Sequence, residues 1–451
     1  MKIIRYISAK IMYLSILVIV LSAAASAEVL TLDQCIDTAL KNNFGVIQAR
    51  NSLSTAKGQV YSAWGGIAPV ISISAGRSQT WSNPFSDTSR IPIYSDTTLI
   101  GYITQSRAGG GKSVGYSGSL TFSQRYSGLG LGTYANIKKA YHNKSSFLYS
   151  YYSAQIGLVQ SVKTAYYSAL RSKMLVAVDS DAVKRSDERL RVTQSRYDLG
   201  SAAMSDVLRA KVQLATDQLS LVSDANAYQS ALVNLAFVMG IPVNEQFDIT
   251  DKLPEVKSNA TYEEALSEAL SQNPDYRRAQ FDLYSSKDAA QLAYSNNLPS
   301  LNFSVIHSTS VPKASQLTDF KRQDANYTFS VSLGFNIFNG FIDYANVRAA
   351  RNNVNTASEN LKNTKNSVAL AVRQAFLDIQ KAEQERELSD QSVASAQEDY
   401  NLVKEKYDLG AAAILDLLDA EVALKQAQIS QVQALFDYNL AVANLDKAMG
   451  K

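Results

Sequence analysis

Four segments of the chain alternate between apolar and small polar residues. From residue 327 to residue 337 every odd position is aromatic or aliphatic, whereas the even positions between them are Thr, Ser, Gly or Asn. A repeat of two with one apolar face predicts strands that are buried on one side. A soluble sandwich would show the same alternation, but small polar residues on the other face favour a wall between lipid and a watery lumen. The predicted strands span residues 67–80, 114–126, 299–310 and 326–338.

Most of the remaining chain has the three-and-four spacing of amphipathic helices. Residues 341–407 contain no Pro and no Gly, which allows a helix of about 100 Å at 1.5 Å per residue. Its apolar side chains toward residue 407 follow the spacing of a coiled coil. The sequence predicts further helices over residues 31–64, 134–197, 204–239, 261–295 and 413–449.

The chain contains an internal duplication. Residues 196–240 and 406–450 align without a gap, and 20 of the 45 positions are identical. A repeat of this length indicates that one structural unit is used twice. We therefore predict a first repeat over residues 28–240, a connector over residues 241–260 at the equatorial region, and a second repeat over residues 261–451.

The number of strands points to an assembly. Four strands cannot close a wide barrel, and an open sheet edge is not tolerated within lipid. Three chains of four strands would supply 12, enough for an open interior. The polar segments at residues 82–112 and 312–324 are predicted to be long loops, which outer-membrane barrels place outside the cell.

The first 27 residues have the features of a cleaved signal peptide. Lys2, Arg5 and Lys10 precede an apolar stretch at residues 11–21, and residues 25–27 form an Ala-Ser-Ala cleavage site. The apolar stretch is too short to span a bilayer. Without the three basic residues the formal charge falls from +3 to 0, so no basic excess points to nucleic acid as a partner.

The single cysteine, Cys35, excludes an internal disulfide. The residues before it are not the small residues of a lipid-attachment site, and we expect Cys35 to be a half-buried helix residue. These observations leave a secreted or outer-membrane protein whose strands and long helices belong to two copies of one unit.

Several motifs resemble a known family. Residues 196–200 and 406–410 both contain Tyr-Asp-Leu-Gly after a basic residue, and each is followed by Ala-x-x-Asp-(Val/Leu)-Leu. Residues 333–341 are Leu-Gly-Phe-Asn-Ile-Phe-Asn-Gly-Phe at a predicted strand-to-helix junction, and residues 298–301 are Leu-Pro-Ser-Leu. Over residues 28–450 the chain resembles the TolC family of outer-membrane efflux proteins.

The resemblance implies a mixed α and β membrane protein. Tandem helix–strand–strand–helix repeats would give, in a homotrimer, a 12-stranded outer-membrane β-barrel continued by a long periplasmic α-helical barrel. The implied location is the outer membrane of a Gram-negative bacterium, in contact with its lipid. The implied function is a passive exit duct of a tripartite efflux pump or type I secretion system, gated at its periplasmic tip. The implied partners are a periplasmic adaptor and, through it, an inner-membrane pump.

Two carboxylates are the candidates for the pore constriction. Asp416 and Asp419 are three residues apart, so they lie on one face of the predicted helix. The resemblance implies that acidic residues at these positions ring the periplasmic opening, where repeated negative charge favours cations. Alternatively, Asp in the first turns of a helix complements the helix dipole. This alternative fits Asp416 and its counterpart Asp206 better than Asp419, whose counterpart is Arg209.

The two turns between helices are the candidate contacts for an adaptor. Each glycine is expected to end a helix in the left-handed conformation, and the resemblance implies that small residues there let another hairpin approach. The candidate contact residues are Leu199, Gly200, Ser201, Leu409, Gly410 and Ala411. Ala412 stands where the family's best-known pattern has a basic residue that helps close the tip. Arg196, Asp206 and Arg209 are therefore candidates for gate ion pairs.

Aromatic residues cluster where strands become helices. They are expected either to form a belt at the membrane–water boundary or to pack the junction between sheet and helices. The candidates are Phe122, Tyr126, Tyr134, Phe335, Phe338, Phe341 and Tyr344.

The sequence offers no support for catalysis. His142 and His307 are the only histidines and lack partners at metal-site or triad spacing. Residues 108–113, Ala-Gly-Gly-Gly-Lys-Ser, lack the first glycine of a phosphate-binding loop and precede a strand. We expect no enzyme, cofactor or metal. The alternative function is a periplasmic coiled-coil adaptor or scaffold. An adaptor would need lipoyl-like and small barrel domains around one hairpin, whereas this chain inserts a strand pair with a long loop twice.

Overall fold

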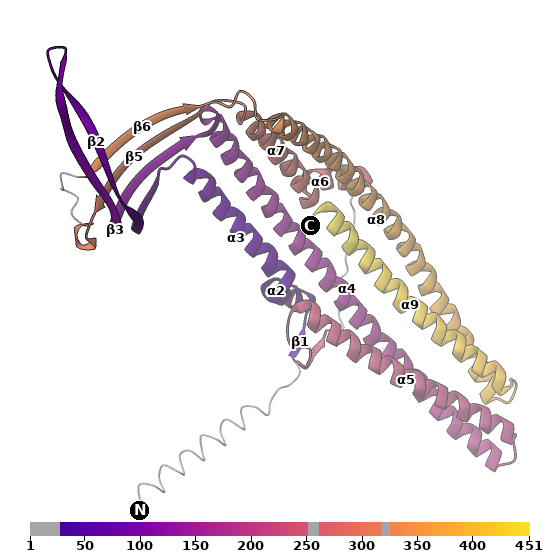
Figure 1. The fold of residues 1–451 in the computed structure, drawn as a ribbon. Coiled ribbons are helices and arrows are strands. Elements are labelled where there is room, and N and C mark those ends of the chain that lie inside the picture. Colours follow the sequence, from indigo (N-terminus) through magenta and orange to yellow (C-terminus); the bar gives the residue numbers. More distant parts are fainter. Residues whose placement is uncertain (1–27, 251–260, 318–324) are drawn as a thin grey trace, which may run out of the picture. The chain divides into compact units, whose positions relative to one another are not determined.

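The computed structural model describes residues 28–250, 261–317 and 325–451 (Figure 1). They form two compact units, each assembled from separate stretches of the chain. Two long helices, α4 (Leu131–Asp198) and α8 (Ile342–Asp408), contribute to both units. The first unit comprises residues 28–55, 144–250, 261–282 and 358–451, and the second comprises residues 56–143, 283–317 and 325–357. The predicted signal peptide lies outside the described residues.

Two predicted helices are each broken in two. Residues 31–64 form α2 (Leu32–Asn42) and α3 (Phe44–Gly65), and residues 261–295 form α6 (Tyr262–Gln272) and α7 (Pro274–Ser295). The predictions of single helices were therefore wrong. The two other short helices, α5 (Met204–Met239) and α9 (Ile414–Met449), begin within one residue of their predicted start.

Asparagine side chains hold both breaks. The Asn43 amide donates to the carbonyl of Val238 at the end of α5 at 3.0 Å, and its oxygen accepts from the Gly45 N–H at 2.8 Å. Asn273 repeats this arrangement with Ala448 at 3.1 Å and Asp275 at 3.0 Å. One side chain therefore satisfies backbone groups at the ends of two helices, which the helices cannot satisfy themselves.

Glycine is required at the helix ends that meet these asparagines. Gly240 and Gly450 follow α5 and α9 with φ of 73° and 89°. A Cβ at Gly240 would lie 2.8 Å from the carbonyl oxygen of Asn42, and one at Gly450 would lie 2.9 Å from the Cα of Asn273. The left-handed conformation and the close backbone approach both favour glycine.

The second unit contains a four-stranded antiparallel sheet in the order β2-β3-β5-β6. Its strands are β2 (Val70–Ser95), β3 (Thr98–Tyr126), β5 (Ser300–Val311) and β6 (Asn326–Gly334). The predicted loop over residues 82–112 is wrong, because β2 and β3 continue through it as a paired ribbon. β6 ends before the predicted residue 338, because β5 begins opposite Gly334 at Ser300 and offers no partner beyond it.

The two faces of the sheet differ in chemistry. The register aligns one residue from each strand across the sheet, and opposed residues share a face. One such row is apolar, with Ile71, Phe122, Val305 and Phe329. A row on the other face is polar, with Ser74, Ser119, Ser308 and Asn326. The Ser74 and Ser119 hydroxyls lie 2.8 Å apart.

The two repeats place equivalent residues in equivalent cores. Val162 and Leu235 are fully buried in the first unit around α4 and α5. Val372 and Leu445, 210 positions later, are buried to the same extent in a second cluster around α8 and α9. Duplicated sequence therefore produces duplicated packing.

Two short strands form a separate pair in the first unit. β1 (Glu28–Leu30) pairs in parallel with β4 (Phe247–Ile249), which belongs to the predicted connector. Residues 251–260 of that connector lie outside the described residues. Short 3-10 segments cover Ser127–Gly130 and Ala314–Gln316. In the described ranges, no helix combines the length and the apolar content needed to cross a membrane.

Candidate functional site

The turns that follow the two long helices share one backbone design. Gly200 adopts φ of +77°, and the N–H of Ser201 donates to the carbonyl of Arg196 at 2.8 Å. Residues 406–411 repeat the bond at 2.8 Å, and Gly410 has the same φ. This is the left-handed glycine ending that the sequence predicted.

The apolar residues of these turns face outward. Leu199 and Leu409 are 82% and 78% exposed, and Ser201 and Ala411 are exposed beside them. Within the described chain, no element covers either leucine. The two turns therefore present small and apolar groups that another molecule can reach.

Two of the candidate acids cap helices. The Asp416 carboxylate accepts a hydrogen bond from the Ala413 N–H at 3.0 Å, at the start of α9. Asp206 accepts the equivalent bond from Ala203 at 3.3 Å, at the start of α5. The alternative role considered for these residues, at the positive end of a helix, therefore has a direct structural basis.

Asp419 lies one turn further along α9 and makes no such bond. Its side chain is exposed, and within the described residues it has neither a hydrogen bond nor an ion pair. Arg209, its counterpart on α5, is likewise exposed and has no ion pair in the described part of the chain. Helix capping explains Asp416 and Asp206 but leaves Asp419 without a structural role in the single chain.

Arg196 is engaged within the chain. Its guanidinium donates to the carbonyls of Tyr407 and Asp408, at 3.1 and 3.3 Å, where α8 ends. A cation at a helix C-terminus is stabilised by the carbonyls exposed there. Arg196, one of the three candidates for gate ion pairs, therefore links the ends of the two long helices.

Ala412 belongs to an apolar cluster. It is half-buried and packs with the cluster that includes Tyr407, Ile414 and Leu417. Apolar packing thus occupies the position at which the resemblance led us to expect a basic side chain.

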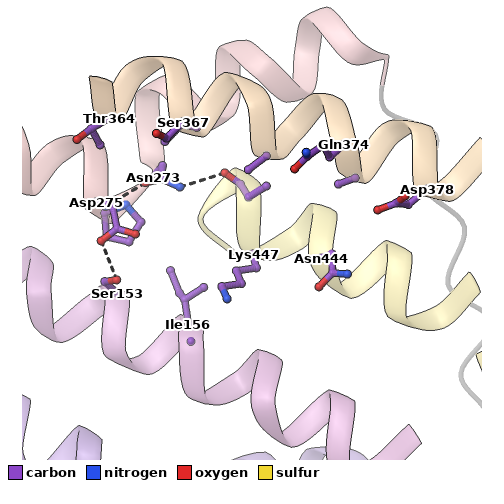
Figure 2. A pocket seen from close by; sticks show the side chains of 16 residues that line it. Ser153, Ile156, Asn273, Asp275, Thr364, Ser367, Gln374, Asp378, Asn444 and Lys447 are labelled. Atoms are coloured by element: carbon purple, nitrogen blue, oxygen red, sulfur yellow. Dashed lines mark hydrogen bonds between the residues drawn. The ribbon is translucent and has the colours of Figure 1, made fainter. Parts of the chain in front are cut away.

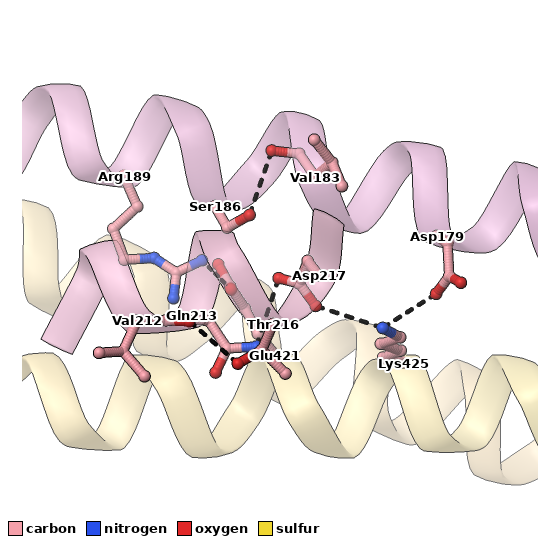
Figure 3. Close-up of polar contacts among 10 residues, drawn as sticks. All are labelled: Asp179, Val183, Ser186, Arg189, Val212, Gln213, Thr216, Asp217, Glu421 and Lys425. Atoms are coloured by element: carbon pink, nitrogen blue, oxygen red, sulfur yellow. Dashed lines mark hydrogen bonds and ion pairs between the residues drawn. The ribbon is translucent and has the colours of Figure 1, made fainter. Parts of the chain in front are cut away.

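A buried set of charges lies deeper among the helices (Figure 3). The Lys425 ammonium from α9 lies 2.9 Å from Asp179 on α4 and 3.2 Å from Asp217 on α5. Both carboxylates are nearly fully buried, and their hydrogen bonds hold the pKa of Lys425 above its usual value although burial opposes it. Sequence reasoning missed this site, since its three residues come from three helices.

A second buried pair extends the set. Arg189 on α4 is 5% exposed and pairs with Glu421 on α9. Asp224 on α5 faces Asp179, and burial together with the hydrogen bond and charge of Asp179 raises the pKa of Asp224. Breaking a buried pair on one side is costly, because the other charge stays buried. A shift of α4, α5 or α9 along its axis would therefore separate these buried charges at a cost in stability.

A cavity of about 390 Å³ lies where α7 begins, among α4, α8 and α9 (Figure 2). Asp275 accepts from the Ser153 hydroxyl at 2.9 Å, and the neighbouring Asn273 binds the end of α9. Lys447 and Asp378 also line it. The hydrogen bonds of Asp275 and Asn273 hold α4 and α9 against the start of α7. The cavity is therefore part of the packing around the break between α6 and α7.

The histidines are held by ordinary contacts. His142 Nδ1 lies 2.5 Å from the Asp288 carboxylate, and the His307 ring packs at 4.5 Å from that of Tyr327. Among the described residues, no group of three or more His, Cys, Asp or Glu side chains is placed to hold a metal.

The candidate interface aromatics are mostly exposed in the single chain. Phe338 and Phe341 make an edge-on contact at 5.2 Å but remain 72% and 71% exposed. Tyr126 is the exception, because it is half-buried and packs edge-on against Phe303 at 6.3 Å. The exposed candidates are Phe122, Tyr134, Phe335, Phe338, Phe341 and Tyr344.

Comparison with known proteins decides the family. The model of the family described as "Outer membrane efflux protein" matches residues 35–241 and 265–451, which is most of the chain. The chain belongs to the outer membrane efflux protein family. It is 24% identical over 305 residues to the pyoverdine export outer membrane protein OpmQ of Pseudomonas putida, and 25% identical over 317 residues to the outer membrane protein TolC of Escherichia coli. The matched regions cover 66% and 67% of this chain but only 63% of each relative.

Solved structures of the family share the fold. The Campylobacter jejuni CmeC outer membrane channel superimposes with a TM-score of 0.78 at 18% identity, over 93% of this chain and 85% of CmeC. VceC of Vibrio cholerae gives a TM-score of 0.77 at 16% identity, over 93% and 96%. The predicted fold class is thus confirmed. As a member of this family, the protein is located in the outer membrane of a Gram-negative bacterium and has a periplasmic extension.

Proposed function

We propose that the protein is a passive exit duct built from three copies of this chain. The four-stranded sheet carries the proposal, because it has one apolar face, one face of small hydroxyl side chains, and open edges at β2 and β6. Open edges are not tolerated in lipid. Three sheets joined edge to edge would close a 12-stranded wall with an apolar outside and a polar lumen.

The length of the sheet supports this proposal. β3 pairs with β5 from Tyr116 to Tyr126, and β6 covers Asn326–Gly334. A strand needs roughly 9–11 residues to cross a bilayer, which matches these stretches. The exposed aromatics that follow β6 stand at the end of this span, where an interfacial belt would be expected.

We propose that Asp419, with Asp416, narrows the periplasmic opening. Asp416 caps α9, whereas the exposed Asp419 carboxylate is available for another role. Three copies would bring repeated negative charge into one opening, which favours cations. Arg196 would support the closed tip by holding the two long helices of each chain together.

The exposed turns at Leu199–Ser201 and Leu409–Ala411 are the proposed contacts for a periplasmic adaptor. Their small residues let another hairpin approach, and their leucines offer apolar surface at the centre of the contact. The adaptor would in turn join an inner-membrane pump that supplies the energy for export.

The test is to extract the protein from outer membranes and determine its mass in detergent by native mass spectrometry. We expect three chains, and liposomes containing this species should swell in solutions of small sugars. Recovery of the protein in the soluble periplasmic fraction, or a monomer that leaves liposomes sealed, would contradict the proposal.

A further inference from the structure

The hairpin of β2 and β3 extends far beyond the rest of the sheet (Figure 1). β3 pairs with β5 only from Tyr116 onward, whereas its pairing with β2 continues to Ser95 and Thr98. Residues 78–95 and 98–115 therefore form a two-stranded ribbon. At ~3.3 Å per residue, the β3 arm of this ribbon is up to about 60 Å long.

The end of the ribbon is apolar, unlike its stem. The stem, residues 82–90 and 104–113, consists mostly of Ser, Thr, Gly and charged residues. The ribbon tip carries six large apolar side chains that are 43–65% exposed. These residues, which define the ribbon tip, are Ile91, Tyr94, Leu99, Ile100, Tyr102 and Ile103.

An exposed apolar tip of this kind is expected to pack against another surface. A two-stranded hairpin is marginally stable alone in water, and contiguous exposed apolar patches usually mark contact sites. Both faces of the ribbon are apolar at this end. Ile91 is opposite Ile103 on one face, and Pro92 is opposite Tyr102 on the other. A ring of three identical ribbons needs two contacting surfaces on each copy, whereas a single partner or a lipid surface needs only one.

The charges of the ribbon also favour a second copy. Over the ribbon and its turn, residues 78–115, the charged residues are Asp87, Arg90, Asp96, Arg107 and Lys112, with a net charge of +1. Asp87 and Arg107 are directly opposite each other. An anionic lipid surface would be matched by a cluster of basic residues, whereas the one extra base, Lys112, is paired with Trp81 at the opposite end of the ribbon from the tip. At the tip end, residues 90–104 contain one base, Arg90, and one acid, Asp96, so identical tips can meet without net repulsion.

We propose that the ribbon tips of neighbouring copies pack against one another at the extracellular end of the assembly. This inference rests on the proposed trimer, which places three ribbons at one end of the barrel. The polar stems below the joined tips would stay hydrated and leave openings between them for solutes.

Cysteine cross-linking in outer membranes tests this proposal. The native thiol, Cys35, is buried in the first unit, so it does not compete. Thr98→Cys places a thiol at the tip, and Ser106→Cys is the matched control on the exposed stem. With a short bifunctional maleimide, Thr98→Cys should give a dimer band on denaturing gels, and Ser106→Cys should give none. Each chain has one reactive thiol, so at most two of the three chains are joined.

A second variant identifies the cause of the contact. Adding Ile91→Glu and Ile103→Glu to Thr98→Cys should abolish the dimer band while native mass spectrometry still finds a trimer. Persistence of the band would overturn the proposal. A trimer whose tips never cross-link, or tips that cross-link to another protein or insert into lipopolysaccharide vesicles, would also overturn it and leave the duct intact. If native mass spectrometry finds no trimer of the unmodified protein, that result would instead contradict the proposed function.

Discussion

The guanidinium carbon of Arg196 lies 4.5 Å from the centre of the Tyr407 ring, and its Nη1 donates to the Tyr407 carbonyl at 3.1 Å. Arg196 lies in the last turn of α4 and Tyr407 in the last turn of α8, so one side chain joins the two repeats where their long helices stop. Stacking on the ring and bonding to the helix end use two properties of arginine that lysine does not combine.

We therefore predict that Arg196→Ala loosens the tip. Amides of residues 196–203 and 406–412 should exchange hydrogen for deuterium faster, and Arg196→Lys should give an intermediate rate. Arg191→Ala is the control, because Arg191 is exposed and pairs with Glu188 one turn away on the same helix. Equal exchange in the Arg196 and Arg191 variants would show that this contact does not hold the tip.

Removing Lys425 should destabilise the first unit strongly. Lys425→Ala leaves Asp179 and Asp217 buried without their cation, a change that typically costs about 3–5 kcal/mol. The midpoint of thermal unfolding, followed by circular dichroism, should fall accordingly. Because the carboxylates are the cause, adding Asp179→Asn and Asp217→Asn to Lys425→Met should recover part of the loss.

Lys184→Ala provides the comparison for Lys425. Lys184 pairs with Asp181 at 3.0 Å, but both side chains are more than half exposed. An exposed pair contributes about 0–1 kcal/mol, so its midpoint should barely move. Similar decreases in the unfolding midpoint of Lys184→Ala and Lys425→Ala would mean that burial of an ion pair does not determine how much its loss destabilises the protein.

Asp248 should make stability depend on pH in the acid range. Burial opposes its ionisation, but hydrogen bonds from Tyr228 and Lys173 outweigh this effect and lower the pKa of Asp248 below its usual 3.8. The folded state therefore binds fewer protons than the unfolded state, and this stabilisation is present above the unfolded pKa. It is lost as pH falls through the folded pKa. Asp248→Asn should lower the unfolding midpoint at neutral pH, with a deficit that shrinks below about pH 4.

Asp224 should show the opposite sign. Its pKa is raised by burial and by Asp179, so the folded state favours the protonated carboxyl and stability rises as pH falls through the folded pKa. Asp224→Asn should therefore raise the midpoint of thermal unfolding at neutral pH, and the difference from the unmodified protein should disappear in acid. Parallel pH profiles for the Asp224 and Asp248 variants would contradict both assignments.

Adjacent residues of β3 should respond differently to a charge. Phe122 belongs to the apolar row, whereas Thr121 faces the polar side. An arginine facing lipid costs about 2–4 kcal/mol near the bilayer centre, whereas lumen positions tolerate charge. Phe122→Arg should reduce the amount of assembled protein in outer membranes, and Thr121→Arg should not. The reverse order would place lipid on the other face.

The internal duplication is visible in the sequence itself, and residues aligned by it are buried in equivalent clusters because the two copies carry similar apolar residues. Val162 and Val372 occupy equivalent cores for this reason. The helix breaks were missed, although Pro274 directly after Asn273 marked the second one, since proline favours the first position of a helix. The break at Asn43 has no such signal and depends on its bond to Val238.

The ribbon and the buried charges were missed for different physical reasons. Residues 82–112 lack one apolar face, because a two-stranded ribbon is exposed on both sides, so the alternation that reveals a strand is absent. Lys425 resembles any surface lysine in the sequence, because its two acids come from other helices. The roles of Asp416, Asp419 and the turns stay predictions.

The central claim is that three copies form an aqueous duct with carboxylates at its narrow end. Single-channel recording of the purified protein in a planar bilayer under a salt gradient tests it most directly. We expect cation-selective openings. The reversal potential should move toward zero in the double variant Asp416→Ala with Asp419→Ala. It should not change in Glu398→Gln, which removes an exposed charge on α8 rather than on α9. An absence of openings from the assembled protein would contradict the account.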